Sequence, residues 1–320
     1  MKALVTGAPG FIGSHLVESL IKKGYTVTCL TRKTSHHRWI EHLDIFSIHG
    51  DLSDPSSYRN DLTEYDVVFH VAGVTKAATE KDFFIGNAEN TKKLLQVIGD
   101  TQPHIKRFVF LSSHAAVGPS HNGIPVNEDS PPRPVSAYGR SKLEAEKQVY
   151  AFENTIPFSI IRPPAVYGPR DTDFLLLFKA IKNGIYPYWG ECHYSLLHVE
   201  DLVNGIVLSA ERHEAENQLF FLSDSIHYTN DEIAKEISSA LGTRALKLRL
   251  PRPCMPFLAF LGEKFNQRSI MNRERVKDFR YLNWTCDSGK AKDEIGFEST
   301  IPLREGIKWT ADWYRIHKWL

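Results

Sequence analysis

A tyrosine and a lysine lie four residues apart in the segment Tyr138-Gly139-Arg140-Ser141-Lys142. On a helix this spacing puts both side chains on one face, roughly 5–6 Å apart between their Cβ atoms. A free phenol has a pKa of about 10, which must fall by roughly 3 units, or about 4 kcal/mol, for proton exchange near neutrality. A lysine charge at about 5 Å supplies around 3 kcal/mol at an effective dielectric constant of about 20. The pair therefore predicts a tyrosine that acts as a general acid or base.

A hydroxyl group lies where it can assist this pair. The apolar run Phe108–Leu111 predicts a strand, and it leads into Ser112 and Ser113, about 25 residues before Tyr138. The carboxyl ends of parallel strands face the ligand crevice, so a hydroxyl there can hold a reacting oxygen for proton exchange. The alternative is that these serines only satisfy backbone groups at the strand end.

A glycine-rich turn follows the first apolar run. Residues 6–13 read Thr-Gly-Ala-Pro-Gly-Phe-Ile-Gly, which spaces Gly7, Gly10 and Gly13 by three. Glycines here permit a tight turn, a close approach of backbone to a pyrophosphate, and close packing of helix on strand. The N-terminus of the following helix adds free N–H groups and a partial positive charge. The turn predicts a dinucleotide site, with Phe11 and Ile12 among the cofactor-binding residues.

The residues after the second and third apolar runs bear on the choice of cofactor. An acidic residue after the second run would accept the ribose hydroxyls of NAD, but the chain has Arg32 and Lys33 there. The planar donors of Arg32 suit a 2′-phosphate, so NADP(H) is favoured. NAD(H) stays possible, because the two cations could belong to a solvated loop. Asp51 and Leu52 follow the third run, where a carboxylate can accept a hydrogen bond from the adenine amino group.

Short apolar runs alternate with helical patterns and must position these residues. Strands are predicted at residues 3–5, 25–30, 46–48, 67–71, 108–111 and 158–161, and helices at residues 15–23, 87–98 and 137–152. This alternation predicts an α/β fold, a Rossmann-type doubly wound parallel sheet that is buried on both faces. After about residue 162 this alternation is replaced by a cluster of Pro and Gly and then by longer helical patterns. We therefore predict an NAD(P)-binding domain over residues 1–165 and a smaller C-terminal substrate-binding lobe, partly interwoven with it, over residues 166–320.

These motifs occur in an order that resembles the extended short-chain dehydrogenase/reductase superfamily, the NAD-dependent epimerase/dehydratase group. Besides the glycine-rich turn and Asp51-Leu52, they are His70-Val71-Ala72-Gly73, Ser112-Ser113 before Gly118, the segment from Tyr138 to Lys142, and Arg162-Pro163-Pro164-Ala165-Val166-Tyr167-Gly168-Pro169. The resemblance covers essentially the whole chain. It implies that Ser113, Tyr138 and Lys142 are catalytic, and that Asn87 marks a helix kink that supports the lysine.

The resemblance also implies cofactor contacts and a partner. Tyr138 and Lys142 would touch the cofactor as well as the substrate. The other contacts it implies are Val71, Ala72 and Gly73 along the cofactor, and Pro163 and Val166 beside the nicotinamide. The helices around residues 87–98 and 137–152 would pair across a homodimer.

Three reactions share the scaffold that the chain resembles: oxidoreduction, 4-epimerisation and 4,6-dehydration of sugars. Dehydratases carry Asp-Glu directly after the catalytic hydroxyl, but His114 and Ala115 lie there. Nucleotide-sugar 4-epimerases place an arginine before a His/Tyr-Val-x-Asp motif, whereas residues 193–201 read His-Tyr-Ser-Leu-Leu-His-Val-Glu-Asp. We therefore predict hydride transfer between nicotinamide and a secondary alcohol or ketone of a small or ring-shaped substrate. The chain resembles the branch that contains hydroxysteroid dehydrogenases and dihydroflavonol reductases more closely than it resembles the nucleotide-sugar epimerases.

Two other functions stay open. In a nucleotide-sugar 4-epimerase, Arg170 or Arg252 would have to grip the diphosphate. In a non-catalytic dinucleotide-binding regulator, the Tyr138–Lys142 pair would serve no reaction. The apolar residues 250–261 favour a wall or lid over an apolar substrate, and contact with a membrane surface is the alternative.

The composition excludes several classes of partner. A net charge of +1 gives no long-range attraction to nucleic acid, and no apolar run approaches the roughly 20 residues that span a bilayer. The four cysteines have no metal or redox spacing, and the N-terminus lacks the apolar run of a signal peptide. His36, His37, His42 and His49 cluster without a ligand spacing. We expect a cytoplasmic protein without a metal.

Overall fold

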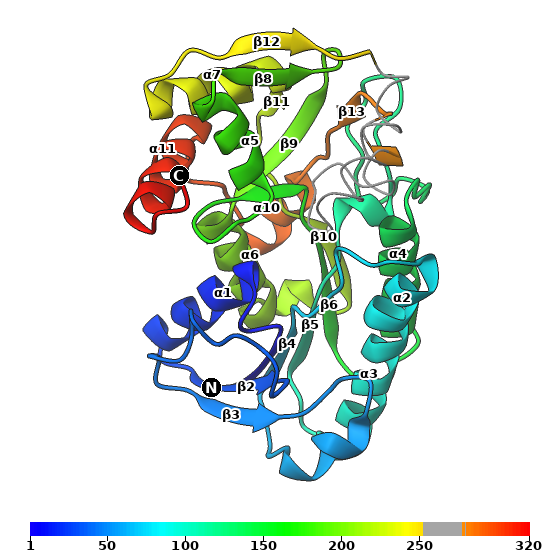
Figure 1. Cartoon of the computed structure of the whole chain (residues 1–320). Coiled ribbons are helices and arrows are strands. Elements are labelled where there is room, and N and C mark those ends of the chain that lie inside the picture. The colour runs from blue at the N-terminus through cyan, green and yellow to red at the C-terminus, as the bar shows by residue number, and fades with distance from the viewer. Residues whose placement is uncertain (252–276, 279) are drawn as a thin grey trace.

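The computed structural model describes residues 1–251, 277–278 and 280–320. Its centre is a seven-stranded parallel sheet with the order β10-β6-β5-β4-β1-β2-β3 (Figure 1). The strands are β1 (Lys2–Thr6), β2 (Thr26–Thr31), β3 (Phe46–His49), β4 (Val67–His70), β5 (Arg107–Leu111), β6 (Phe158–Arg162) and β10 (Gln218–Phe221). The order reverses between β1 and β4, where a doubly wound sheet opens its ligand crevice. The predicted Rossmann-type α/β fold is confirmed.

Helices cover both faces of this sheet. One apolar cluster joins a face of the sheet to α1 (Phe11–Lys22), α6 (Val199–Glu211) and α10 (Gly289–Ile295). The other face packs on α3 (Asn90–Thr101) and α4 (Ala137–Tyr150), which run side by side in Figure 1. Successive strand residues point to opposite faces of the sheet. The strands β4, β5 and β6 are buried at every residue, as expected between two helical layers, whereas the edge strand β3 is mostly exposed.

The second half of the chain builds a smaller lobe at the top of Figure 1. Its helices are α5 (Phe174–Lys182), α7 (Asn230–Leu241) and α11 (Leu303–Ile316), which share a third apolar cluster. Its strands are β7 (Ala165–Tyr167), β8 (Ile185–Tyr188), β9 (His193–His198), β11 (His227–Thr229), β12 (Leu246–Arg249) and β13 (Asn283–Trp284). Helix α6 packs against α1, and β10 is the sheet strand beside β6. The chain beyond residue 166 therefore also contributes to the large sheet.

Most predicted elements end within one or two residues of the observed ones, but two helices begin elsewhere. Helix α1 begins at Phe11 rather than residue 15. The helix predicted at residues 87–98 is part of a longer run, which starts with α2 (Glu80–Phe84) and continues through a π-helical turn, Ile85–Glu89. A capping box of Thr79 and Asp82 starts α2.

Part of the predicted substrate region lies outside the described residues. This holds for Arg252 and for residues 252–261 of the apolar stretch. In the part of the chain that is described, no helix is long and apolar enough to cross a membrane.

Candidate active site

The glycine-rich turn joins β1 to α1 at the carboxyl edge of the sheet. Gly7 has a φ of +73°, and a Cβ on it would lie 2.6 Å from the backbone N of Ala72. A Cβ on Gly13 would lie 2.1 Å from the carbonyl oxygen of Gly7. The turn can therefore approach β4 and α1 this closely only because both positions are glycine.

The N-terminus of α1 offers unfilled donors beside this turn. Gly10 is its N-cap residue, and no described side chain caps the helix. Phe11 and Ile12 begin the first turn and pack against the core. The first N–H groups of a helix have no intrahelical partner, and the helix dipole favours an anion there. This cradle fits the pyrophosphate of a nicotinamide dinucleotide.

The residues predicted to select the cofactor lie at the ends of β2 and β3. Arg32 directly follows β2 and is exposed. Asp51 lies just after β3, and its Oδ1 accepts hydrogen bonds of 2.8 Å from both N and Oγ of Ser53. These bonds, and more weakly the charge of Arg32, lower the pKa of Asp51. The cation Arg32 and the carboxylate Asp51 thus lie after neighbouring strands at this edge of the sheet.

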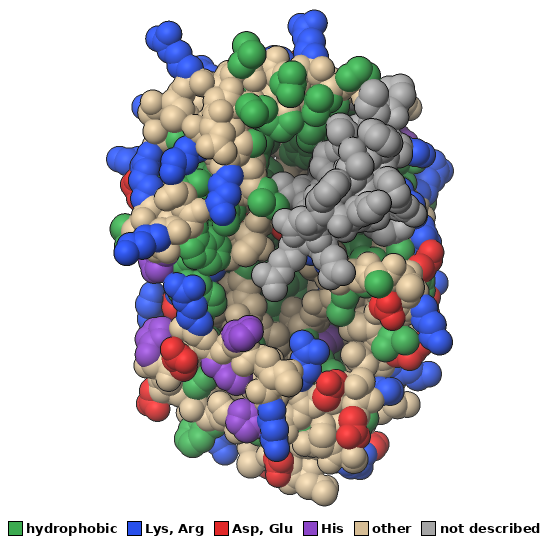
Figure 2. Space-filling model, in the orientation of Figure 1, with side chains coloured by type: hydrophobic (Ala, Val, Ile, Leu, Met, Phe, Trp, Pro, Cys, Tyr) green, Lys and Arg blue, Asp and Glu red, His purple; other side chains and the backbone are tan. Residues whose placement is uncertain are grey.

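The histidines noted in the sequence lie around the same strand ends. Figure 2 shows histidine side chains among basic ones on this part of the surface. The Nε2 atom of His37 lies 3.1 Å from Oγ1 of Thr31, and the rings of His37 and His49 lie 6.2 Å apart. The described residues contain no group of three or more His, Cys, Asp or Glu that could hold a metal ion.

The remaining predicted cofactor contacts lie at the same edge, after β3, β4 and β6. They are Leu52, Val71, Ala72, Gly73, Pro163 and Val166. A Cβ on Gly73 would lie 3.2 Å from Nζ of Lys142 and 3.3 Å from Oδ1 of Asn87. The loop after β4 therefore meets both the predicted lysine and the predicted asparagine.

Helix α4 carries Tyr138 in its first turn and Lys142 one turn later. The helix begins where Oγ of Ser136 accepts a hydrogen bond of 3.3 Å from N of Gly139. Tyr138 is half-buried, with the edge of its ring against Phe83, whereas Lys142 is buried. Burial lowers the pKa of Lys142 to about 8, although the charge of Glu146 opposes this shift.

A hydrogen bond joins this helix to the strand end that carries Ser113. Nζ of Lys142 donates to the carbonyl oxygen of Leu111 at 2.7 Å, and Leu111 is the last residue of β5. Ser113 is half-buried, and its Oγ accepts from N of Ala115 at 3.2 Å. That bond uses a lone pair, so the hydroxyl proton can still be donated to a substrate oxygen.

Asn87 lies in the π-helical turn and is buried. Its Oδ1 accepts from N of Val74 at 2.7 Å, and its Nδ2 donates to O of Val74 at 3.0 Å and to Oγ of Ser141 at 2.9 Å. Ser141 directly precedes Lys142. Asn87 therefore ties the loop after β4 to the helix that carries the lysine.

A second polar chain runs beneath the site and was not predicted. His70, the last residue of β4, has Nδ1 at 2.7 Å from Oγ1 of Thr6 and Nε2 at 2.8 Å from Oγ1 of Thr91. Thr91 in turn donates to the carbonyl oxygen of Asn87 at 2.5 Å. Burial lowers the pKa of His70 to about 3, so the ring is neutral. The His-Val-Ala-Gly motif was visible in the sequence, but only the fold brings its histidine to Thr6 and Thr91.

A buried ion pair behind Lys142 was also missed. Glu146 accepts from Nε of Arg162 at 2.9 Å and from its second terminal nitrogen at 2.6 Å, and it also accepts from Oγ of Ser112. Glu146 and Arg162 are 1% and 4% exposed. The available signal was the spacing: Glu146 follows Lys142 by four residues, so it shares the helix face of Tyr138 and Lys142.

Arg170, which the epimerase alternative would use to grip a diphosphate, lies against α1 in this structure. Its side chain contacts α1, where it donates to Oγ of Ser14 at 3.0 Å and to Oε1 of Glu18 at 2.5 Å. The guanidinium also lies over the ring of Trp39, 5.1 Å from its centroid. These contacts pair its charge with a carboxylate already.

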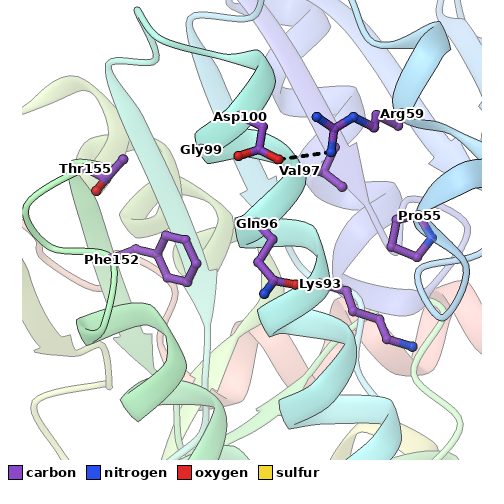
Figure 3. A pocket seen from close by; sticks show the side chains of 9 residues that line it. All are labelled: Pro55, Arg59, Lys93, Gln96, Val97, Gly99, Asp100, Phe152 and Thr155. Carbon is purple, nitrogen blue, oxygen red and sulfur yellow. Dashed lines mark hydrogen bonds and ion pairs between the residues drawn. The ribbon is translucent and has the colours of Figure 1, made fainter.

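A pocket of about 430 Å³ lies apart from all these residues, beside the helices α3 and α4 (Figure 3). Its walls include Pro55, Lys93 and Phe152, and an ion pair of 3.0 Å between Arg59 and Asp100 crosses its rim. None of the predicted site residues lines it, so this pocket is separate from the candidate active site.

The fold and the site together define a dinucleotide-binding α/β protein with a Tyr–Lys pair at the switch point of its sheet. Residues 3–220 match the model of the NAD dependent epimerase/dehydratase family, and the chain belongs to that family. The predicted family and the prediction of an enzyme of this kind are confirmed.

Comparisons with individual proteins give two kinds of relative. The ceramide reductase of Caulobacter vibrioides is 29% identical over 99% of this chain and 95% of its own. The UDP-glucose 4-epimerase of Vibrio cholerae is also 29% identical, over 96% of this chain and 94% of its own. The solved UDP-glucose 4-epimerase of Thermotoga maritima has a TM-score of 0.83 and 22% identity over 99% of this chain and 100% of that one. Equal identity to a reductase and an epimerase leaves the reaction to be argued from the site.

Proposed function

We propose that this protein is an NADP(H)-dependent oxidoreductase that interconverts a secondary alcohol and a ketone. The observation that carries the proposal is the buried Lys142, one helical turn from Tyr138 and hydrogen-bonded to the strand end of Ser113. Such a cation stabilises a phenolate, so Tyr138 can exchange a proton near neutral pH.

In the proposed reaction, Ser113, Tyr138 and Lys142 would have different roles. In the reducing direction, Ser113 donates a hydrogen bond to the ketone oxygen and holds it beside Tyr138. Tyr138 gives its proton to that oxygen, and Lys142 stabilises the phenolate that results. In the oxidising direction the same phenolate takes the proton of the alcohol. A bound nicotinamide supplies or accepts the hydride at the carbon atom.

The cofactor site supports NADP(H) over NAD(H). The glycine cradle and the N-terminus of α1 would hold the pyrophosphate, which both cofactors share. Arg32 is exposed at the end of β2, where it can pair with a 2′-phosphate. Asp51 and Leu52 would contact the adenine. The chain would accordingly divide into a cofactor-binding part over residues 1–165 and a substrate-binding part over residues 166–320.

The pairing of Arg170 bears on the substrate class. A 4-epimerase must hold a nucleoside diphosphate, and burying that charge without paired cations is costly. Arg170 is already paired with Glu18, which favours net oxidoreduction of a small or ring-shaped substrate. The named activity of the Caulobacter relative, a reductase, agrees with this preference.

The experiment is a panel of hydrophobic ketones and UDP-sugars, followed by the absorbance of reduced nicotinamide. A net oxidoreductase consumes NADPH in proportion to the ketone reduced. Conversion of a UDP-sugar to its 4-epimer with no net change in absorbance would instead show that the alternative function is correct. The Arg170→Ala variant then serves as a check, because it weakens sugar binding only if this arginine grips the diphosphate.

We also propose a cytoplasmic location. Within the described part of the chain, Cys29 and Cys286 are buried thiols that form no disulfide, as is usual in a reducing compartment. Fractionation of cells that express the tagged protein tests this directly.

A further inference from the structure

The helix that carries Tyr138 and Lys142 carries a third ionisable residue on the same face. Tyr138, Lys142 and Glu146 follow one another at intervals of four residues, so they lie on consecutive turns of α4. Lys142 and Glu146 are 3% and 1% exposed. Their mutual attraction is therefore hardly screened by water.

Two residues from neighbouring strands hold Glu146 in place. Arg162, the last residue of β6, binds both carboxylate oxygens, at 2.9 and 2.6 Å. Ser112 follows β5 and donates its hydroxyl to the same carboxylate. The backbone N of Ser112 also donates to the carbonyl oxygen of Ile161 at 2.7 Å. Glu146 thus joins α4 to the ends of two strands, directly before Ser113.

The carbonyl oxygen of Leu111 and the ring of Phe110, 4.8 Å from Nζ, favour the ammonium form of Lys142, but neither carries a charge. His70 on β4 is neutral, because burial lowers its pKa to about 3, and so is His114 beside Ser113, for the same reason. Asn87 and Gly73 offer no charge. Burial favours the neutral amine of Lys142, and Glu146 is the carboxylate that opposes it.

We propose that Glu146, anchored by Arg162 and Ser112, is a positioning residue that keeps Lys142 cationic beside Tyr138 and fixes the strand end that carries Ser113. This inference rests on the proposed function, because Glu146 can act as a positioning residue only if Tyr138 and Lys142 take part in proton exchange with a substrate. It names residues that act through Lys142 and do not touch the substrate.

The test is the pH dependence of kcat for NADPH-driven reduction of the best ketone from the panel. Reduction needs Tyr138 protonated and Lys142 charged, so turnover falls as pH rises. In Glu146→Gln this fall should begin about one pH unit lower, a roughly tenfold change in proton affinity. Glu146→Asp keeps the charge and should leave the fall near its wild-type pH. Glu144→Gln is the matched control, since Glu144 lies on the same helix in an exposed pair with Lys147.

A purely structural role would lower kcat at every pH and leave the shape of the profile unchanged, and that outcome would overturn the proposal. Should Glu146→Gln fail to fold, Arg162→Met is the second variant. It leaves the charge of Glu146 unshared, so the fall should move to higher pH, and an unmoved fall would overturn the proposal.

A second readout needs neither cofactor nor substrate. Because Lys142 has a lowered pKa in the folded state, the unfolded chain binds a proton that the folded one lacks between about pH 8 and the ordinary lysine pKa. Stability should therefore rise with pH in that range, relative to a Lys142→Met variant at the same pH. With Glu146→Gln the rise should begin at lower pH. An unshifted rise would refute the coupling of Glu146 to Lys142, whereas an inactive ketone panel would refute only the proposed function.

Discussion

Burial favours the neutral form of Lys142, whereas the proposed catalysis needs its charged form. Removing the ammonium group from water favours its neutral form and lowers its pKa to about 8. The same lack of water strengthens its effect on the neighbouring phenol, because a charge acts further in a medium of low dielectric constant. The hydrogen bond to the carbonyl oxygen of Leu111 and the carboxylate of Glu146 offset part of the burial cost.

The first prediction concerns Tyr138. Tyr138→Phe keeps the ring and its contact with Phe83 but removes the proton donor. We expect turnover to fall by about 100-fold or more, the usual contribution of general acid–base catalysis. The affinity for NADPH, measured by fluorescence titration, should barely change. Unchanged turnover on a true substrate would rule out Tyr138 as the acid.

The second prediction concerns Arg32 and the choice of cofactor. Arg32→Ala removes a charge-assisted hydrogen bond to the 2′-phosphate, which should cost about 1.5–3 kcal/mol of binding free energy for NADPH. NADH has no 2′-phosphate, so its affinity should stay the same. Titration of both cofactors against both proteins measures this. The idea fails if the wild type binds NADH and NADPH equally well.

At the scale of elements, the sequence predicts six of the seven strands of the large sheet, but it predicts neither β10 nor the hydrogen bonds that connect the elements. The strand end at Leu111, and the end at His70 to within one residue, follow from apolar runs that are buried on both faces. The π-helical turn at Asn87 does not follow from local pattern, since it depends on hydrogen bonds to Val74 and Ser141 from other elements. For the same reason, the spacing of Glu146 after Lys142 could not reveal its partner Arg162.

The third prediction tests the junction of β1 with α1. A Cβ at position 13 would lie 2.1 Å from a backbone oxygen, whereas at position 10 it would lie 3.2 Å from the same atom. Gly13→Ala should therefore destabilise the protein without cofactor by about 1–3 kcal/mol, as overpacking of a core usually does. Gly10→Ala is the matched control and should cost less stability. Urea unfolding of both variants makes the comparison, and equal losses would contradict it.

At the scale of the whole molecule, several side chains tie the smaller lobe to the sheet. Arg170 pairs with Glu18 on α1, and Lys76 after β4 pairs with Asp173 before α5 at 2.8 Å. Trp39 after β2 lies 5.4 Å from Trp313 of α11. The segment that follows Arg32 therefore contacts the lobe that would hold the substrate.

The fourth prediction concerns assembly. The resemblance to extended short-chain dehydrogenases implies a homodimer through α3 and α4, which lie together on one face of the sheet. Sedimentation equilibrium should then give a mass of twice 36.4 kDa. A mass of one chain at every concentration up to the micromolar range would contradict the pairing.

The last prediction concerns acid stability, which depends on buried histidines distributed over the molecule. Burial lowers the pKa of His70 and His114 to about 3 and that of His198 to about 4. In the unfolded chain each of these histidines has a pKa near 6.5. Below that pH the unfolded state therefore binds more protons than the folded state. The contribution of these histidines to the free energy of unfolding should therefore be fully present above about pH 6.5. It should fall on acidification, by up to about 4 kcal/mol per pH unit for the three together. Urea unfolding at pH 7, 6 and 5 measures the slope, and His114→Phe should reduce it by about a third, because a phenyl ring has no site for a proton. If the variant and the wild type lose stability in parallel between pH 7 and 5, His114 does not contribute to the acid sensitivity.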